Sequence, residues 1–529
     1  MAGSKPQQFA RPPPKKKPPK AASLITPDDF QSSADFEESA GGKHRVGDAQ
    51  KSARAFIRAL DIYDRGLAKH PSSFDLAYNK ARLQLEISQQ PVLVELIGVE
   101  LLQWLESTLA SHRRALQLSV ENVDVLFNTA QVLTSLAEVL VEDGEDEGDE
   151  EEEAKASRAL QEALELLSVC LSRQEVLFEQ HRADFPDVEE GGVALDAQEG
   201  GVALDAQEGA AESSTPAAPP AAQEDDTDMA EATIETPISP SDLLDTVHAS
   251  LSALTTLLPL SDHSALQNLG EMARALTEDK APTYIRLLDS TAQAPATLSL
   301  ALDRAVFIAA YANAEFEARQ LHFSTYLSRL DESFRIPGKE SDASLLCAEA
   351  DARMEMVLSA LDVFGQGAPN FPVHTCWKTL SLSQELYTLA SKLETEDAKE
   401  RKADVFKSKG DVELLRLRLT QMAGTDLSAS VRSSGPTLVK NAQTFYKGAV
   451  SQAKASGDEE VEEEAKGRWI VAGEVSRVVF GGQGSGAGEK SGEDLMEVLE
   501  GCVEEGIVGR DVAGRIVNGE VGGGSSSRA

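Results

Sequence analysis

The sequence predicts an all-α protein in which amphipathic helical hairpins stack into an α-solenoid interrupted by acidic loops. Three observations support this prediction. Small and aromatic residues recur at fixed helical offsets along the chain. Aromatic residues make up only 5% of the 529 residues and hydrophobic residues 41%, a balance that favours helix-on-helix packing over sheets. Acidic runs, which must be solvated, interrupt the helical stretches.

The first hairpin is predicted over residues 53–85, where two amphipathic stretches flank a short turn with a proline. Small residues let antiparallel helices approach closely, an aromatic side chain fills the adjacent gap, and a proline ends the helix. The residues expected to pack in this way have offsets of zero, four, seven and twelve and continue into the next helix; they are Ala59, Tyr63, Gly66, Pro71, Tyr78 and Ala81.

The same pattern recurs further along the chain and predicts additional hairpins. Around residues 122–142 and in the helix after it, the expected packing residues are Phe127, Ala130, Ala163 and Cys170. A Gly-Asp pair within residues 396–419 predicts a turn between two helices there. The packing residues of this region are Ala403, Phe406, Gly410, Ala442, Tyr446 and Ala449. Other helices are expected at 91–120, 241–260, 264–279, 295–330, 344–365, 375–393 and 462–480, with weak helix at 493–517.

These hairpins resemble tetratricopeptide repeats, most clearly over 50–180 and more weakly over 396–455. No unit has the complete W-x2-L-G-x2-Y pattern, and insertions lengthen the units, so the repeat count stays open. As a whole the chain resembles uncharacterised fungal tetratricopeptide proteins. The resemblance implies protein binding in a concave groove, in which Asn79 and Asn128 are candidate client-binding residues.

One tetratricopeptide subclass grips the C-terminal carboxylate of heat-shock chaperones with lysine, arginine and asparagine side chains. Asn79 matches one of its positions in this sequence. The slots on the first and fifth helices hold other residues, namely His44, Asp48, Asp124 and Asn128. A carboxylate cannot replace a cation in gripping a carboxylate, so we expect no binding of chaperone tails.

Composition divides the chain into five segments. We predict a disordered, basic, Pro-rich tail at 1–41 and tetratricopeptide-like repeats at 42–185 with an acidic insertion at 142–153. A disordered acidic Ala/Pro linker at 186–240 contains the sequence EGGVALDAQ twice in tandem, at 190–198 and 199–207. A second helical, tetratricopeptide-like region at 241–480 and a Gly-rich tail at 481–529 follow. Whether the two helical regions stack on one another stays open.

The net charge of −38 favours basic partners and argues against direct nucleic-acid binding. Ten of the twelve residues at 142–153 are acidic, and this run is expected in the turn of a hairpin. Some histone chaperones of this repeat class carry a similar insertion; the alternative is a loop that aids solubility. Its candidate client-binding residues are Glu145, Asp146, Glu147, Asp149, Glu150, Glu151, Glu152 and Glu153.

We therefore expect a non-enzymatic adaptor or assembly chaperone for a basic client, such as a histone or a ribosomal protein. The alternative is a scaffold subunit that binds a larger complex through apolar helix faces. Four dispersed cysteines and the lack of a long apolar run predict a nuclear or cytoplasmic protein without membrane contact. A short basic run resembles a nuclear-import signal, with a solvated tail as the alternative; its residues are Lys15, Lys16, Lys17 and Lys20.

Motifs for catalysis, metals or cofactors are missing from the sequence. The stretch GGQGSGAGEKS at 481–491 imitates a phosphate-binding loop, but Glu489 interrupts the required ending. No HExxH, GxSxG or EF-hand pattern occurs, and the histidines lack ligand-spaced partners. We expect no enzyme activity, no cofactor and no metal.

Overall fold

The computed structural model describes residues 24–45, 47–144, 150–184, 237–365, 368, 370–422, 427–481 and 492–520. These residues form twenty-one α-helices, one π-helical turn and one 3₁₀ turn, and they contain no strand. The prediction of an all-α fold is therefore confirmed.

The first helices form a stack of hairpins. They are α1 (Pro27–His44), α2 (Ala49–Lys69), α3 (Phe74–Ser88), the short α4 (Pro91–Ile97) and α5 (Leu101–Leu118). Helix α1 packs along α2, and α3 packs along α5. Small residues allow these close approaches. A Cβ atom on Gly41 of α1 would lie 2.4 Å from the ring of Phe56 on α2.

Helix α1 overturns the prediction that residues 1–41 form a disordered tail. The Thr26 side chain and the Asp29 carboxylate cap the helix reciprocally, and proline occupies its first turn. The helix buries Phe30, which contacts Gly66 of α2. Residues 27–41 thus belong to the first hairpin, and residues 1–23 lie outside the described part of the chain.

The helices α6 (Val123–Gly144) and α7 (Glu150–Asp184) form the hairpin that flanks the acidic insertion. The Sγ atom of Cys170, late in α7, lies 3.4 Å from the carbonyl oxygen of Val123, which begins α6. The two helices are therefore antiparallel. The run at 142–153 comprises the end of α6, the start of α7 and residues 145–149, which lie outside the described ranges.

Helix α8 (Pro240–Leu257) packs directly on α7, so the stack continues past residues 186–236. The buried Thr246 hydroxyl of α8 donates to the Oε1 atom of Gln174 on α7, at 2.8 Å. One apolar core includes side chains from both sides of this junction, from Leu85 to Phe307. The two helical regions, whose stacking the sequence left open, therefore form one continuous stack.

The middle of the stack comprises α9 (Leu266–Arg274), the π-turn η1 (Ala275–Lys280), α10 (Ala281–Ile285), α11 (Gln293–Glu317), α12 (Phe323–Ser333), the 3₁₀ turn η2 (Lys339–Ser341), α13 (Ala343–Phe364) and α14 (Val373–Ala390). The single helix predicted over 295–330 is in fact α11 and α12, because Arg319 adopts a left-handed conformation with φ of 58°. Helix α11 joins two cores: Phe307 lies in the first and Phe316 in the second.

The last helices are α15 (Glu396–Glu400), α16 (Lys402–Gln421), α17 (Ala429–Arg432), α18 (Gly435–Ser456), α19 (Glu459–Phe480), α20 (Gly492–Glu504) and α21 (Arg510–Val517). The turn predicted at Gly410 is wrong, because α16 continues through it. A Cβ atom there would lie 2.4 Å from the ring of Tyr446, so Gly410 allows α16 and α18 to approach. The boundary predicted at residue 481 is also wrong, since α20 and α21 bury Leu499 and Val512 in the third core.

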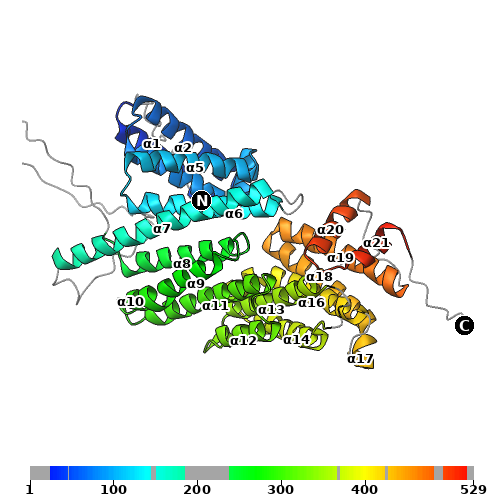
Figure 1. Ribbon diagram of the computed structural model, residues 1–529. Helices are drawn as coiled ribbons and strands as arrows, with labels where there is room; N and C mark the ends of the chain where they lie inside the picture. The colour runs from blue at the N-terminus through cyan, green and yellow to red at the C-terminus, as the bar shows by residue number, and fades with distance from the viewer. Residues whose placement is uncertain are drawn as a thin grey trace, which may run out of the picture.

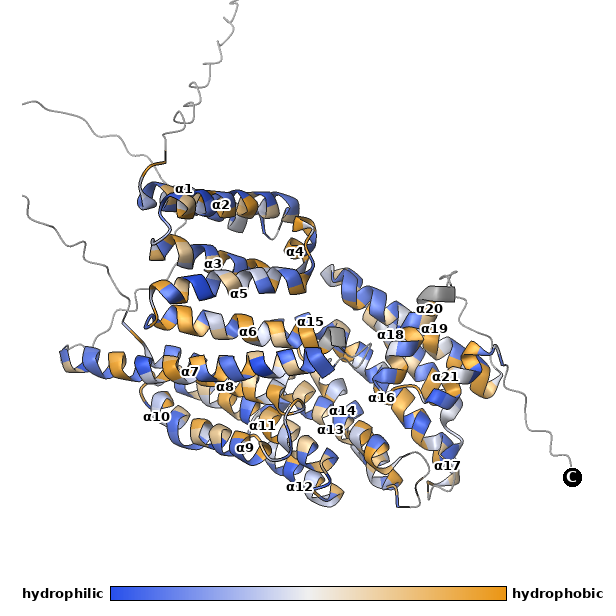
Figure 2. Cartoon of the chain, turned by 45° about the horizontal axis from the view of Figure 1, so that its top comes forward, coloured by the Kyte–Doolittle hydropathy of each residue, from blue (hydrophilic) through white to orange (hydrophobic). Residues whose placement is uncertain are grey.

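The helices follow one another in space nearly as they do in the sequence (Figure 1). Each main helix packs against its chain neighbours, from the α1–α2 pair through α7 and α8 to the α18–α19 pair. Figure 2 shows the first hairpins lying one above another, with apolar and polar residues alternating along each helix. This arrangement is an α-solenoid, as predicted. Within it, α1, α3, α6, α8 and α11 form an inner row in which each helix contacts the next.

Candidate client-binding groove

A groove of about 600 Å³ opens along the inner row of the solenoid. Its lining residues come from α3, α6, α7, α8 and α11 and from Gln89, which caps the end of α3. Helix α3 contributes its C-terminal end, and α6 contributes its middle, from Phe127 to Glu138. We refer to this site as the inner groove; its lining residues are Leu85, Gln89, Phe127, Ala130, Gln131, Thr134, Ser135, Glu138, Leu167, Asp245, His248, Ala249, Ser252 and Asp303.

The charged side chains of the inner groove are predominantly acidic. Among the residues that the structure describes, its lining contains three carboxylates, those of Glu138, Asp245 and Asp303, and no lysine or arginine. The Nδ1 atom of His248 pairs with the Asp303 carboxylate. This hydrogen bond raises the pKa of His248 above its ordinary value. The described lining therefore has more acidic than basic side chains, whether or not this imidazole is protonated.

The environment of Asp245 disfavours the charged form of its carboxylate. Desolvation and the neighbouring Asp242 carboxylate raise the pKa of Asp245. Both effects disfavour the charged carboxylate. A lysine or arginine side chain that entered the groove would reverse this penalty, because a nearby positive charge stabilises the carboxylate.

The sequence-predicted asparagines lie beside the inner groove but do not line it. The Nδ2 atom of Asn79 on α3 donates to Oε1 of Gln31 on α1, at 3.1 Å. The Nδ2 atom of Asn128 on α6 donates to the hydroxyl of Tyr78 on α3, at 3.4 Å. Each asparagine thus bonds to the preceding helix of the inner row. Their positions favour a role in holding that row together.

The predicted packing residues lie mostly inside the stack. Twelve are buried: Ala59, Tyr63, Gly66, Ala81, Ala130, Ala163, Cys170, Ala403, Gly410, Ala442, Tyr446 and Ala449. Tyr78, Phe127 and Phe406 are half-buried, and Phe127 lines the inner groove. Pro71 is a correction, because it is exposed in the turn after α2 and packs against no core.

The acidic insertion follows Glu138 in the sequence, from the last turn of α6 onward. Glu138 lines the groove less than two turns before α6 ends at Gly144. Glu150, Glu151, Glu152 and Glu153 form the first turn of α7. The predicted residues Glu145, Asp146, Glu147 and Asp149 lie outside the described ranges, as do Lys15, Lys16, Lys17 and Lys20. Glu150–Glu153 therefore add four carboxylates at the start of the helix that pairs with α6.

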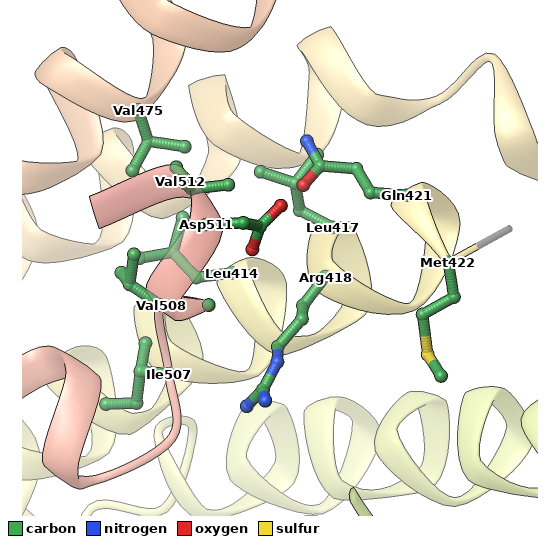
Figure 3. A pocket seen from close by; sticks show the side chains of 11 residues that line it. Leu414, Leu417, Arg418, Gln421, Met422, Val475, Ile507, Val508, Asp511 and Val512 are labelled. Carbon is green, nitrogen blue, oxygen red and sulfur yellow. The ribbon is translucent and has the colours of Figure 1, made fainter. Parts of the chain in front are cut away.

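A second, smaller cavity lies near the C-terminal end of the solenoid (Figure 3). Its volume of about 210 Å³ is roughly a third of that of the inner groove. Apolar side chains from α16, α19 and the α20–α21 segment form most of its wall, including Leu414, Val475 and Val512. The guanidinium of Arg418 donates to the carbonyl oxygen of Gly506. This cavity is too small and too apolar for a charged peptide.

Potential metal ligands, cysteines and a long apolar helix in the described chain do not form a second candidate site. No group of three or more His, Cys, Asp or Glu side chains in these residues is placed to hold a metal. The four cysteines are free and buried. One helix, α6, is long and apolar enough over Val123–Val141 to cross a membrane, but 56% of that window is buried in the protein. Its position between α5 and α7 is that of a core helix.

Comparisons with known proteins give little further information. No known protein-family profile matches the chain. The UPF0656 protein C926.02 of Schizosaccharomyces pombe is 34% identical over 146 residues, which span 28% of this chain and only 30% of the relative. A solved "circular tandem repeat protein with novel repeat topology and enhanced subunit contact surfaces" is 12% identical, covering 93% of this chain and 94% of that one. Its TM-score of 0.27 carries no structural argument, so the fold assignment rests on the helix contacts.

Proposed function

We propose that this protein is a non-enzymatic, tetratricopeptide-like adaptor or assembly chaperone that holds a basic segment of a client protein in the inner groove. The observation that carries the proposal is the lining of that groove, in which the described part of the chain places three carboxylates and no lysine or arginine. Helical-repeat solenoids commonly bind partners on an extended concave surface. The chemistry of this surface fits lysine and arginine side chains, as in a histone or a ribosomal protein.

The acidic insertion supports the same client class. Glu150–Glu153 begin α7, the partner of α6 in its hairpin, and the sequence continues this charge through 142–149. Negative charge around a binding site accelerates the encounter with a cationic partner and orients it. The tail of a heat-shock chaperone ends in a carboxylate, which the groove would repel. A nuclear or cytoplasmic location fits the predicted import signal at Lys15–Lys17 and Lys20.

A groove variant tests the proposal directly. Asp245→Asn combined with Asp303→Asn removes two groove carboxylates with little change in shape. We expect its affinity for a fluorescent lysine-rich peptide to fall about ten-fold at low salt, because two attractive charges are lost. The wild-type affinity should fall steeply as salt rises.

The matched control replaces two exposed carboxylates outside the groove, by Glu95→Gln and Glu332→Gln. This variant has the same net charge as the groove variant, so it should keep nearly wild-type affinity. Circular dichroism establishes that both variants fold. Equal losses in the two variants would mean that the peptide responds to net charge alone, and the groove assignment would be wrong.

The scaffold alternative has one structural observation in its favour. Val169 and Val176 lie two turns apart on α7 with exposed fractions of 54% and 47%. An apolar stripe of this kind could bind a partner in a larger complex. Affinity purification at low and high salt separates the two functions. Basic proteins released by high salt would support the adaptor, and a fixed set of partners that resist high salt would support the scaffold.

A further inference from the structure

Lys409 of α16 is the only buried lysine in the described chain, with 6% of its surface exposed. Its Nζ atom lies 5.3 Å from the centre of the Phe406 ring and 4.6 Å from that of the Phe445 ring. No described carboxylate is within ion-pair distance of this ammonium, and no described oxygen accepts a hydrogen bond from it. The rings satisfy its charge only in part, and its N–H donors lack an acceptor. Because buried donors in proteins are almost always hydrogen-bonded, Lys409 has capacity for a ligand.

A second lysine and an arginine add positive charge around Lys409. Desolvation and the positive charge of Lys392 lower the pKa of Lys409, and Glu413 offsets this only in part. The Glu413 carboxylate is itself paired, because its Oε1 atom accepts a hydrogen bond from Nη1 of Arg416 at 3.2 Å. Lys392, after the end of α14, is exposed and is therefore open to a partner. Three cations thus lie around one carboxylate, and a further carboxylate brought there would favour the charged form of Lys409.

Aromatic side chains from three helices flank these cations. The guanidinium of Arg416 stacks 4.4 Å from the centre of the Trp377 ring on α14. Phe406 lies against α18, where a Cβ atom on Gly448 would be 2.5 Å from its ring. Trp377, Phe406 and Phe445 are half-buried, so each keeps exposed surface. Aromatic side chains and arginine are enriched at the centres of protein interfaces, so this surface has the composition of a protein-binding site.

The side of α16 that carries Lys409 and Arg416 lies between α14 and α18, which both pack on α16. The two residues are seven apart, which is about two turns or about 10 Å along one side of the helix. Helix α14 runs antiparallel to α16, so Gln384, seven residues after Trp377, lies level with Lys409. The Oε1 atom of Gln384 has no hydrogen-bond partner in the described chain, so its amide is not committed to another helix. We call this surface the basic–aromatic face; its residues are Trp377, Lys392, Phe406, Lys409, Arg416 and Phe445.

We propose that the basic–aromatic face binds an acidic segment of a partner protein, in which an aspartate or glutamate carboxylate accepts hydrogen bonds from Lys409. An extended peptide spans the length of the face with about three residues, so an apolar residue close to the acid contacts Trp377. A carboxylate fits better than a phosphate, because Glu413 would repel the second charge of a phosphate. The proposal goes beyond the basic client, since the inner groove is lined from α3, α6, α7, α8 and α11 and shares no residue with this face.

The test uses the full chain and a labelled peptide that alternates glutamate and leucine, at physiological salt, where distant acids of the protein are screened. Lys409→Gln removes the ammonium, so its affinity for the peptide should fall about ten-fold. The exposed Lys392→Gln, which leaves the core untouched, should lose about three-fold. The matched control is Lys454→Gln, on the opposite side of α18 from Phe445, and it should stay within about two-fold of the wild type. Circular dichroism establishes that all variants fold.

A protection experiment on the wild type needs no substitution. Saturating peptide should slow the acylation of Lys409 by an amine-reactive reagent and leave that of Lys454 unchanged, as read by mass spectrometry. The lysine-rich peptide should bind Lys409→Gln as it binds the wild type, which separates this face from the inner groove. Equal affinity of the wild type, Lys409→Gln and Lys392→Gln for the acidic peptide, or no protection of Lys409, would overturn the inference. Equal binding of a peptide with glutamine in place of glutamate, or tighter binding of one with phosphoserine there, would overturn the assignment of a carboxylate.

Discussion

At the scale of single residues, small and aromatic side chains fill the space between neighbouring helices of the stack. The offsets that selected Ala59 and Tyr63 follow the helical period, and both side chains are fully buried. Gly410 shows the opposite case. A Gly-Asp pair is a common turn signal, yet this glycine lies inside α16. Its lack of a side chain leaves room for the ring of Tyr446. Gly410 and Tyr446 are 36 positions apart, so no local pattern in the sequence predicts their contact.

His112 of α5 gives a prediction at the same scale. Its ring is fully buried, and burial lowers its pKa from 6.5 to about 4. The unfolded chain therefore binds a proton more readily than the folded protein. The contribution of the neutral, buried His112 to the stability of the fold is complete above about pH 6.5 and is lost as the pH falls toward 4. When the pH falls from about 7 to about 5, the unfolding free energy of the wild type should decrease by about 2 kcal/mol more than that of His112→Leu, which lacks this titrating group.

Urea denaturation at the two pH values measures this difference. The exposed His263 provides the control, since His263→Leu should keep the wild-type dependence on pH. Identical pH profiles for the wild type and His112→Leu would contradict the prediction.

At the scale of elements, α1 was missed because its sequence is polar and only weakly amphipathic. A local signal was present, since Thr26 and Asp29 have the spacing of a capping box and Pro27 occupies the first turn. The inner groove could be predicted only in outline. Its residues come from α3, α6, α8 and α11, and no sequence spacing places Asp303 beside His248.

The role of α1 can be tested with two phenylalanines on the same helix. Phe30 is 2% exposed and packs in the first hairpin, whereas Phe36 is 74% exposed. We expect Phe30→Ala to destabilise the protein by about 3–5 kcal/mol, through lost burial and an unfilled cavity. Phe36→Ala should change the unfolding free energy by less than about 0.5 kcal/mol. Thermal unfolding compares the two, and similar melting temperatures would mean that α1 is not part of the folded stack.

At the scale of the whole molecule, the sequence could not establish that the two helical regions are continuous. The decisive contacts cross a long connection, as in the buried hydrogen bond between Thr246 and Gln174. The apolar core on either side of this bond includes Leu171 of α7 and Val247 of α8. Local periodicity describes each helix but not which faces of distant helices meet.

Continuity of the stack predicts the behaviour of a cleaved chain. A site-specific protease sequence inserted after Gln207 would allow cleavage between α7 and α8. We expect the two fragments to migrate together in size-exclusion chromatography, because they share an apolar core. High salt should not separate them, since apolar contacts are not screened. Denaturing electrophoresis verifies cleavage, and two separate native peaks would show that the halves are independent.

The junction between α7 and α8 also bears on how this chain can vary over generations. Direct packing of α8 on α7 sets the geometry of the stack, so the connection at 185–239 need only be long enough to join them. Lengthening it by the nine residues of the tandem duplication at 190–207 costs about 0.2 kcal/mol of closure entropy. Replication slippage can therefore expand or contract this stretch almost without selection on folding. Orthologues should differ in length here far more than within α7 or α8.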